Sequence, residues 1–209
     1  MVGDVAGAAP GGLGLLGGTF DPPHVGHLLI AQTAMAELSL ERVLFLPAGQ
    51  PVHKGNQEVS AAHHRVTMAR LAVAGNDAFV VDTTDVERPG PHTTVTLVPL
   101  LEEKVATRPL WLLIGGDSLR DLPSWVRPQE LVTRIRLAVL PRPGATIDWP
   151  ALEEAITGVR AAVHLLDGPT VALSSTRMRQ WASAGRSLRY MTPDPVCAYI
   201  ARTGLYESQ

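Results

Sequence analysis

The stretch Gly17-Gly18-Thr19-Phe20-Asp21-Pro22-Pro23-His24-Val25-Gly26-His27 decides the fold. It joins a short apolar run, Leu13–Leu16, to a helical pattern that extends from Gly26 to Leu38. The paired glycines allow a sharp turn and a close approach of the backbone to a ligand. A helix that begins here presents unpaired N–H groups and a partial positive charge, and together these favour a phosphate group.

Short apolar runs alternate with helical patterns along the rest of the chain. The runs are apolar on both sides, as strands of a sheet that is covered on both faces must be. This alternation predicts right-handed crossovers and an α/β fold with a single doubly wound, mostly parallel sheet. The expected strands are Leu13–Leu16, Val43–Leu46, Phe79–Val81, Leu110–Ile114, Leu137–Leu140 and Val163–Leu166. The expected helices are Gly26–Leu38, Ser60–Ala74, Thr94–Val105, Asp117–Leu122 with Pro128–Thr133, Pro150–Ala155, Ser175–Ala184 and Pro195–Thr203.

The composition is that of a globular protein with a sizeable core. With 209 residues, of which 45% are hydrophobic and 18% charged, we expect one domain over residues 13–209 after a flexible tail at residues 1–12. A formal net charge of −2 provides no basic excess for nucleic-acid binding. No apolar run reaches the roughly 18 residues of a membrane span. Because Cys197 is the only cysteine, a cytoplasmic protein in a reducing environment is expected.

The first glycines match the spacing of a dinucleotide-binding fingerprint by accident. Gly12-Leu13-Gly14-Leu15-Leu16-Gly17 has that spacing, but the glycines of the fingerprint follow a strand and open a helix. Here they lie around and within the first strand itself. No acidic residue ends the second strand, where a ribose hydroxyl would need one. A dinucleotide site is therefore not expected.

His24 and His27 are three residues apart, so on a first helical turn they share a face. Each can then donate a hydrogen bond to phosphate oxygens of one ligand. The alternatives are a metal-binding pair and two unrelated surface histidines. A metal site lacks a third ligand of clear spacing, since Asp21 is separated from the pair by two prolines. The position of the pair, after a double-glycine turn and at a helix start, favours phosphate binding.

A second candidate phosphate-binding segment is Leu173-Ser174-Ser175-Thr176-Arg177-Met178-Arg179. Ser174 or Ser175 is a good helix cap, and the turn after it presents free N–H groups. Arg177 and Arg179 add guanidinium groups, whose forked geometry suits phosphate. The alternative is an ordinary capped amphipathic helix with exposed arginines. On the phosphate hypothesis, this segment and the stretch around the two histidines lie side by side around one triphosphate.

Both segments resemble the signatures of one superfamily. Gly-Thr-Phe-Asp-Pro-x-His-x-Gly-His, at residues 18–27, is similar to the signature of nucleotidyltransferases built on the His-x-Gly-His motif. Ser-Ser-Thr-x-x-Arg, at residues 174–179, resembles the second motif of the same superfamily. Its members join a nucleoside triphosphate to a phosphorylated acceptor. The resemblance implies that Arg179 binds the β- and γ-phosphates, while Ser175 and Thr176 hold the triphosphate.

Three further stretches narrow the resemblance to the bacterial nicotinate-mononucleotide adenylyltransferases. They are Gly115–Leu119 with Trp125 and Pro141–Gly144, then Pro51-Val52-His53-Lys54, and Tyr190–Val196 with Gly204-Leu205-Tyr206. The resemblance therefore covers nearly the whole chain. It implies a Rossmann-like nucleotidyltransferase domain that transfers the adenylyl group of ATP to nicotinate mononucleotide. The products would be deamido-NAD and pyrophosphate, a step of NAD biosynthesis.

The same resemblance implies the binding residues. Trp125 would stack on the pyridine ring, Lys54 would reach the mononucleotide phosphate, and Asp117 would accept from a ribose hydroxyl on the adenosine side. Without it, they would be a core tryptophan, a solvated lysine and a helix cap. The expected catalytic residues are His24, His27, Lys54 and Arg179. The expected ATP contacts are Gly18, Thr19, Phe20, His24, His27, Gly115, Asp117, Ser175, Thr176 and Arg179, and the expected acceptor contacts are Thr19, Phe20, Lys54, Thr93 and Trp125.

One segment departs from the family pattern. After Glu87–Pro91 the family has an aromatic residue followed by Thr-x-Asp-Thr-Leu, whereas this chain has His92-Thr93-Thr94-Val95-Thr96-Leu97. Read residue by residue, the aromatic position is His92 and the acidic position is Val95. Because this segment lines the mononucleotide pocket in the family, the departure concerns acceptor binding and leaves the triphosphate chemistry unchanged.

The reaction implied by the resemblance is a direct in-line attack of the acceptor phosphate on the α-phosphate of ATP. A phosphate oxygen is already a nucleophile at neutral pH, so alignment and charge stabilisation replace a catalytic base. Mg²⁺ is the expected cofactor, held by ATP phosphates and water rather than by protein ligands. The expected partners are ATP and nicotinate mononucleotide, with no nucleic acid and no membrane; a homodimer, and the protonation of the two histidines, are left open.

In a doubly wound sheet, ligands bind beyond the carboxyl ends of strands, where the strand order reverses. We therefore expect the first strand and Leu110–Ile114 to be neighbours at that reversal, with the loops Gly17–His27 and Gly115–Leu119 facing one crevice. Three alternatives stay open. They are a related enzyme with phosphopantetheine or nicotinamide mononucleotide as acceptor, a nucleotide sensor without turnover, and a metal hydrolase built on the two histidines.

Overall fold

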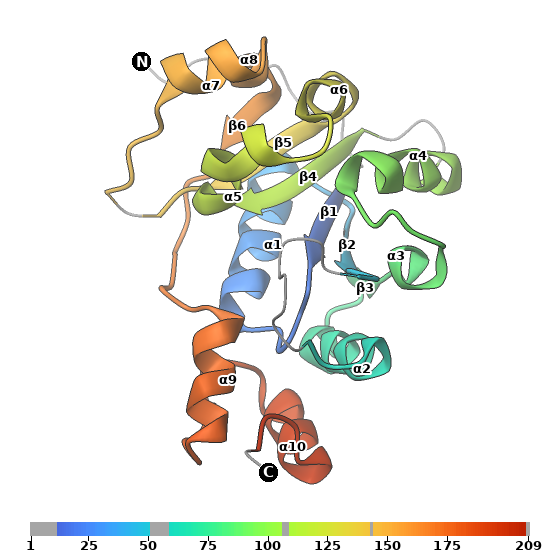
Figure 1. Ribbon diagram of the computed structural model, residues 1–209, viewed down its shortest axis with the longest axis vertical. Coiled ribbons are helices and arrows are strands. Elements are labelled where there is room, and N and C mark those ends of the chain that lie inside the picture. The colour runs from blue at the N-terminus through green and yellow to red at the C-terminus, as the bar shows by residue number, and fades with distance from the viewer. Residues whose placement is uncertain (1–11, 51–58, 106–108, 143, 208–209) are drawn as a thin grey trace.

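A six-stranded sheet forms the centre of the molecule (Figure 1). The computed structural model describes residues 12–50, 59–105, 109–142 and 144–207. The strand order is β3-β2-β1-β4-β5-β6, and the five pairings between neighbouring strands are parallel. The strands are β1 (Leu13–Gly18), β2 (Arg42–Pro47), β3 (Phe79–Val81), β4 (Leu110–Gly115), β5 (Arg136–Leu140) and β6 (Val163–Leu165).

Helices follow the strands and cover both faces of the sheet. The first five helices are α1 (Val25–Leu38), α2 (Ala62–Val73), α3 (Thr84–Glu87), α4 (Thr94–Val105) and α5 (Gly116–Asp121). A 3-10 turn, η2 (Leu122–Ser124), follows α5. The remaining helices are α6 (Pro128–Arg134), α7 (Trp149–Ala155), α8 (Val159–Ala162), α9 (Ser175–Ser183) and α10 (Asp194–Thr203). None of these helices combines the length and the apolar character that a membrane crossing requires.

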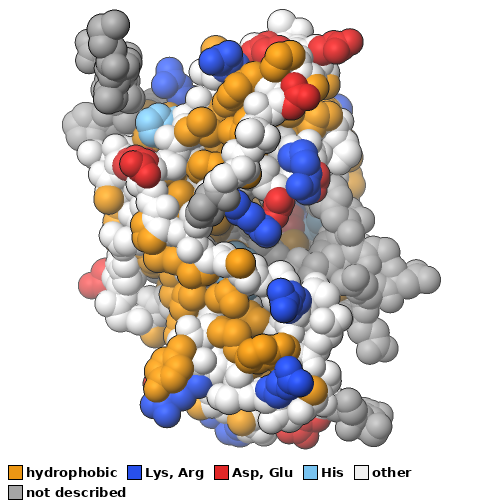
Figure 2. All heavy atoms as spheres, turned by 90° about the vertical axis from the view of Figure 1, so that its left-hand side faces the viewer, with side chains coloured by type: hydrophobic (Ala, Val, Ile, Leu, Met, Phe, Trp, Pro, Cys, Tyr) orange, Lys and Arg blue, Asp and Glu red, His pale blue; other side chains and the backbone are white. Residues whose placement is uncertain are grey.

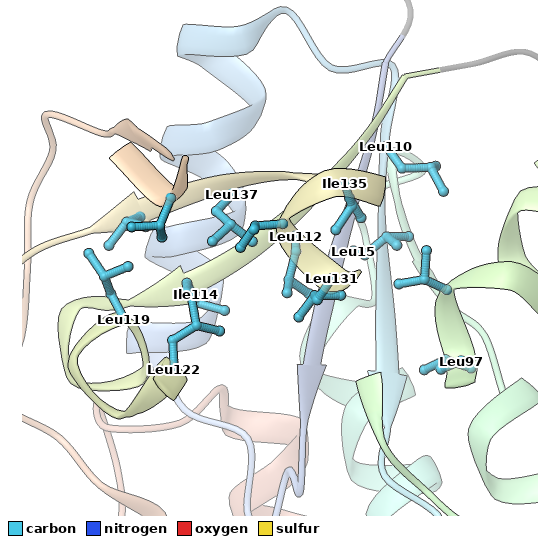
Figure 3. Close-up of a cluster of buried hydrophobic side chains, with 14 of the residues drawn as sticks. Leu15, Leu97, Leu110, Leu112, Ile114, Leu119, Leu122, Leu131, Ile135 and Leu137 are labelled. Carbon is cyan, nitrogen blue, oxygen red and sulfur yellow. The ribbon is translucent and has the colours of Figure 1, made fainter. Parts of the chain in front are cut away.

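The two faces of the sheet are covered because side chains alternate along each strand. In β4, Trp111 and Leu113 belong to a buried cluster with residues of α1 and α2. Leu112 and Ile114 belong to a second cluster with residues of α4, α5, α6, α7 and α8. Figure 3 shows this second cluster, with Leu119, Leu122 and Leu131 packed against β4 and β5. The sheet is therefore buried on both sides, as the apolar runs predict.

A third buried cluster joins the end of the chain to α2. Met68 and Ala72 of α2 pack with Met178 of α9 and with Val196 and Ile200 of α10. In Figure 1, α9 and α10 lie together at one end of the molecule, beyond the carboxyl ends of the strands. This packing places the second candidate phosphate-binding segment at the same end of the sheet as the first.

The strand order reverses between β1 and β4, as expected. These strands are paired through Leu13 with Leu110 and Leu15 with Leu112, whereas β2 follows β1 on the other side. The loops after β1 and β4 therefore emerge side by side at the carboxyl end of the sheet. The doubly wound parallel sheet is confirmed, and all six expected strands are present.

Two short helices, α3 and α8, were not expected. Each has four residues, which is too short for a periodic pattern to indicate. At the start of the chain, the expected tail lies outside the described residues except for Gly12. Gly12 does not belong to a flexible tail, because it is buried and its carbonyl accepts a hydrogen bond from the N–H of Glu41 at 2.9 Å. The extension of a single domain over residues 13–209 stays a prediction.

Gly14 has a packing role, which explains a glycine inside a strand without a dinucleotide. A Cβ atom there would lie 2.9 Å from Leu113 Cδ1 and 3.1 Å from both Leu40 Cδ1 and Val43 Cγ2. At Gly17, on the same strand, an added Cβ would meet no atom of the described residues within 4 Å. The glycines of the accidental fingerprint are thus not equivalent. Packing requires a glycine at position 14, whereas no steric contact of the described residues requires one at position 17.

We expect Gly14→Ala to lower the free energy of unfolding by about 1–3 kcal/mol, because the core must rearrange around the extra methyl group. Gly17→Ala is the matched control and should cause no loss of stability. Urea unfolding followed by circular dichroism measures both. Equal stability of the two variants would contradict this account of Gly14.

Candidate active site

A cavity of about 500 Å³ opens at the carboxyl ends of β1 and β4. It lies where the strand order reverses, so the expectation that the two loops face one crevice is confirmed. The wall also includes the connection after β6, at Pro169–Val171. Eight of the expected site residues line this cavity: Gly18, Thr19, His24, His27, Thr93, Gly115, Asp117 and Trp125.

The two histidines stack on each other at the start of α1. Their ring centroids are 3.8 Å apart, with 26° between the planes. His24 has extended backbone angles just before the helix, and its N–H donates to Nδ1 of His27 at 3.1 Å. Because Nδ1 accepts this bond, the proton of a neutral His27 ring lies on Nε2. The structure thus fixes the tautomer as well as the position of His27.

Burial favours the neutral form of His24 in the folded protein. The residue is only 9% exposed, and burial lowers the pKa of its imidazole to about 4, with a smaller opposing effect of a backbone hydrogen bond. Its Nδ1 is buried without a hydrogen-bond partner among the described residues. His24 can therefore donate a hydrogen bond to a phosphate from a neutral ring, and it brings no positive charge of its own.

Gly26 leaves room for the ring of His24. A Cβ atom at Gly26 would lie 2.9 Å from Nδ1 and 3.0 Å from Cε1 of His24. It would also lie 3.4 Å from Cγ2 of Val171, across the cavity wall. The glycine between the histidines of the motif is therefore a steric requirement of the stacked pair.

The C-terminal part of the chain holds the loop between β1 and α1. This loop contains two prolines, which have no N–H to donate. Three consecutive carbonyl groups of the loop accept hydrogen bonds from side chains of residues 175–192. The donors are Arg179 Nη1 to Asp21 O at 2.8 Å, Ser175 Oγ to Pro22 O at 2.9 Å and Thr192 Oγ1 to Pro23 O at 2.7 Å.

These bonds confirm that the two candidate phosphate-binding segments lie side by side. Ser174 is the cap of α9, with its Oγ accepting from the N–H of Arg177 at 3.3 Å. Ser175, Thr176 and Arg179 follow on the first turns of α9 and contact or flank the loop before α1, outside the lining of the cavity itself. Their role as triphosphate ligands stays a prediction.

The C-terminal segment brings positive charge to this side of the molecule. Figure 2 shows Lys and Arg side chains over the lower half of one face, the end at which α9 and α10 lie in Figure 1. Residues 175–207 carry more arginines than acids. The arginines are Arg177, Arg179, Arg186, Arg189 and Arg202, and the acids are Asp194 and Glu207. Such a surface attracts a polyanion.

Asp117 lies in the first turn of α5 and pairs with arginines. Its Oδ2 is 2.6 Å from Arg142 Nη2, and its Oδ1 is 3.3 Å from Arg120 Nη1. The helix cap is Gly115, so Asp117 is not the cap of its own helix. Asp117 and Arg142 both line the cavity, and the expected contact to a ribose hydroxyl stays a prediction.

Trp125 and Thr93 stand on the wall formed by η2 and the start of α4. Asp85 and His92 line the same region of the cavity. Asp85 is 5% exposed, and its Oδ1 is 2.6 Å from Nη2 of Arg88. The N–H of Gly49 donates to its other oxygen at 2.8 Å. The acceptor side of the cavity thus contains a buried carboxylate–guanidinium pair that the sequence pattern did not indicate.

The segment that departs from the family pattern lies beside Arg88, at the start of α4. Val95, at the position of the family's acid, is 2% exposed and belongs to the core. Thr96, the next residue, receives a hydrogen bond at 3.0 Å from Nη1 of Arg88. The effect of the departure on acceptor binding stays a prediction.

Two expected residues are placed elsewhere or not described. Phe20 is 1% exposed, and its ring packs against Phe45 and edge-on against His27, at centroid distances of 5.8 and 5.0 Å. The side chain of Phe20 packs against the ring of His27 and does not line the cavity. Lys54 lies outside the described residues, so its proposed contact with the acceptor phosphate stays a prediction.

Arg65, which belongs to the stretches that resemble the family but was given no role from the sequence, is a positioning residue. It is 2% exposed, and its guanidinium donates to three backbone carbonyls, those of Ser60, Thr19 and Gly49, at 2.9, 3.1 and 3.1 Å. It thereby ties the loops after β1 and β2 to the start of α2. An arginine on the same helical face as Ala69 and Ala72 was the available indication, because buried arginines are rare unless their donors are satisfied.

Within the described residues, no three His, Cys, Asp or Glu side chains come together as metal ligands would. The carboxylate on the cavity wall nearest the loop after β4, Asp117, is engaged by Arg142.

Comparison with known proteins agrees with this site. A family model described as cytidylyltransferase-like matches residues 15–181. This span runs from β1 into α9, and so it includes both segments that meet at the loop before α1. The chain belongs to the cytidylyltransferase-like family.

Curated relatives narrow the family. A protein of Roseiflexus sp. (strain RS-1), named probable nicotinate-nucleotide adenylyltransferase, is 44% identical over 194 residues, which cover 93% of this chain and 97% of the relative. A protein of the same name from Thermomicrobium roseum is 41% identical over 196 residues, which cover 94% of this chain and 92% of the relative. Within the cytidylyltransferase-like family, the chain is therefore a member of the nicotinate-nucleotide adenylyltransferases.

Solved structures share the fold at lower sequence identity. Nicotinic acid mononucleotide adenylyltransferase of Plasmodium falciparum, complexed with NaAD, superposes with a TM-score of 0.75 at 16% identity. The match covers 94% of this chain and 97% of that one. A second structure of the same protein, complexed with APC, gives a TM-score of 0.73 at 16% identity. This likeness shows the fold.

We expect Gly26→Ala to separate activity from stability. The added methyl group must displace the ring of His24, and a displacement of about 1 Å at a reacting group lowers turnover by about 100-fold. The helix itself tolerates alanine well, so the melting temperature should not fall. Turnover and thermal melting measure the two effects, and Gln32→Ala, an exposed change on α1, is the control. Wild-type turnover by Gly26→Ala would contradict the steric role of Gly26.

The lowered pKa of His24 predicts a pH-dependent stability. Free histidine has a pKa near about 6.5, so between about pH 6.5 and pH 4 the unfolded chain binds more protons at this residue than the folded chain does. Stability contributed by the neutral ring is therefore lost as the pH falls through that range, by about 3 kcal/mol in total. The stability difference between wild type and His24→Asn should shrink accordingly from pH 7 to pH 4 in urea titrations. A constant difference would show that burial does not hold His24 neutral.

Proposed function

We propose that this chain transfers the adenylyl group of ATP to nicotinate mononucleotide and releases pyrophosphate. The observation that carries the proposal is the meeting of the His24–His27 pair with α9 across the loop before α1, beside a cavity at the strand-order reversal. The names of the relatives support the same acceptor. The reaction is one step of NAD biosynthesis.

The reaction is a direct displacement at phosphorus. An oxygen of the acceptor phosphate attacks the α-phosphorus of ATP, and the bond from that phosphorus to the oxygen bridging to the β-phosphate breaks as pyrophosphate leaves. The attacking oxygen needs no base at neutral pH. The protein therefore contributes alignment, which supplies about 7–11 kcal/mol in well-oriented reactions, and hydrogen-bond donors for the developing charge.

The histidines supply donors to the α- and β-phosphates. His24 and His27 line the cavity at the N-terminus of α1, where helix N–H groups add a partial positive charge. His27 donates through Nε2, because its Nδ1 is already occupied by the N–H of His24.

The positive charge comes from α9 and from the loop after β2. Arg179 keeps one N–H on the carbonyl of Asp21, and a guanidinium with five N–H donors can bind the β- and γ-phosphates at the same time. The N–H groups of Ser175 and Thr176 at the start of α9 hold the same triphosphate. Lys54 completes the set on the acceptor phosphate.

The acceptor lies against the wall formed by η2 and the start of α4. Trp125 stacks on its pyridine ring, with Thr93 beside it. Asp117 accepts from a ribose hydroxyl on the adenosine side and is held in place by Arg142. ATP enters as its magnesium complex, in which the phosphates and water coordinate the ion.

The direct test is pyrophosphate release by the purified chain with ATP and Mg²⁺ and one acceptor at a time. We expect turnover with nicotinate mononucleotide, and less with nicotinamide mononucleotide or phosphopantetheine. His27→Ala should lose at least about 100-fold in turnover, because the donor to the transition state is gone, and should keep its far-ultraviolet circular dichroism spectrum. Binding of ATP without turnover on any acceptor would instead indicate a nucleotide sensor, and wild-type turnover by His27→Ala would remove that residue from the mechanism.

A further inference from the structure

The side chain of Asp21 is fully buried beneath the histidine loop. Its exposure is 0%, and each carboxylate oxygen receives one hydrogen bond. Tyr206 donates its hydroxyl to Oδ1 at 2.6 Å, and the N–H of Ser60 donates to Oδ2 at 3.0 Å. Tyr206 lies 185 residues further along the chain. A buried carboxylate is stable only when such partners replace its water.

Arg179 stands beside this carboxylate without forming a close pair with it. Its Nη1 donates to the backbone carbonyl of Asp21 at 2.8 Å, whereas the distance from Nη1 to Oδ2 is 4.0 Å. A bidentate carboxylate–guanidinium pair has distances of about 2.8 Å and is the stronger arrangement. The hydroxyl of Tyr206 and the amide of Ser60 each take one acceptor position of the carboxylate, in an arrangement that keeps its Oδ2 4.0 Å from Arg179 Nη1.

The other guanidinium near Asp21 does not compete for it. Arg65 directs its N–H groups to the carbonyls of Ser60, Thr19 and Gly49. Among the described residues, Arg179 is therefore the cation whose position depends on how the carboxylate of Asp21 is held.

We propose that Tyr206 is a positioning residue for the nucleotide site: its hydroxyl holds the Asp21 carboxylate and weakens its attraction for Arg179, which so stays available to the triphosphate. The inference rests on the proposed function, because it takes the triphosphate as the ligand of Arg179. Without the hydroxyl, Oδ1 of Asp21 is left unpaired in the interior, and Arg179 moves from the carbonyl into a close pair with the carboxylate. The arginine is then withdrawn from ATP.

The side chain of Tyr206 is suited to act as a permanent donor. Burial raises the pKa of its hydroxyl, and the charge of Asp21 raises it further. The hydroxyl therefore stays protonated at every pH at which the protein is active. Its ring packs in the cluster between α2, α9 and α10, and its oxygen is also 3.8 Å from the sulfur of Met68. Removal of the oxygen alone leaves this packing in place.

The test is the dissociation constant of MgATP, measured by calorimetry on the full chain without acceptor. We expect Tyr206→Phe to weaken ATP binding about tenfold, which is the effect of one hydrogen bond to a charged group, while the ring keeps the fold. Tyr199→Phe is the matched control. This change removes a hydroxyl on α10 that is hydrogen-bonded to Nδ1 of His64 at 2.7 Å and not to Asp21. Its ATP dissociation constant should stay within about twofold of wild type.

A double-mutant cycle separates positioning from a general structural effect. Asp21→Asn removes the charge that attracts Arg179, so adding Tyr206→Phe to it should change the ATP dissociation constant by less than about twofold. If Asp21→Asn does not fold, the Arg179→Ala background supplies the same test, because no arginine is left to withdraw. Equal tenfold effects of Tyr206→Phe in all backgrounds would overturn the inference.

The remaining outcomes are also decisive. ATP binding within about twofold of wild type in Tyr206→Phe would overturn the inference, as would a failure of this variant to fold. A wild-type chain that binds ATP but releases no pyrophosphate with any acceptor would contradict the proposed function. The double-mutant cycle would still test the role of Tyr206, because it measures only ATP binding. A wild-type chain that does not bind ATP would overturn both.

Discussion

The loop from Asp21 to Pro23 is the constraint on which the site depends. It has two prolines, its carbonyls are buried, and so it cannot satisfy its own hydrogen bonds. The donors come from Ser175, Arg179 and Thr192, which lie 153 to 169 residues further along the chain. The helix that carries the histidines can therefore start in the right place only when α9 and α10 have packed on α2.

The proposed phosphate site at the start of α1 lies close to the buried carboxyl group of Asp21. A carboxylate without solvent exposure, close to the start of α1, would repel a triphosphate if its charge were not compensated. The hydroxyl of Tyr206, the amide of Ser60 and the two nearby guanidinium groups provide the compensation. Because burial lowers the pKa of His24, the proposed attraction for ATP rests on helix termini, the arginines and Lys54. The carbonyls of the loop and the carboxyl group of Asp21 thus have hydrogen-bond partners within the protein.

The strands, the reversal of strand order and the pairing of the two motif segments were predictable because each rests on a local pattern. An apolar run fixes a buried strand, and a glycine-rich turn after a strand indicates a site at its carboxyl end. The roles of Arg65 and Tyr206 were not predictable in this way. Their partners lie 46 and 185 residues away, and neither the local composition nor the periodicity around them refers to those partners. Contacts that hold a site together at long range are visible only once the chain has folded.

The segment after α3 shows what replaces the family's acid in this chain. Val95, at the acid position, faces the core, and the neighbouring Thr96 faces Arg88. Arg88 already has a carboxylate partner in Asp85, at 2.6 Å. A second acid in this segment would make this wall of the cavity negative, whereas valine and threonine leave one carboxylate balanced by one guanidinium. For an acceptor that carries a phosphate and a carboxylate, the balanced wall is the less repulsive one, so the departure from the family pattern does not argue against an anionic acceptor.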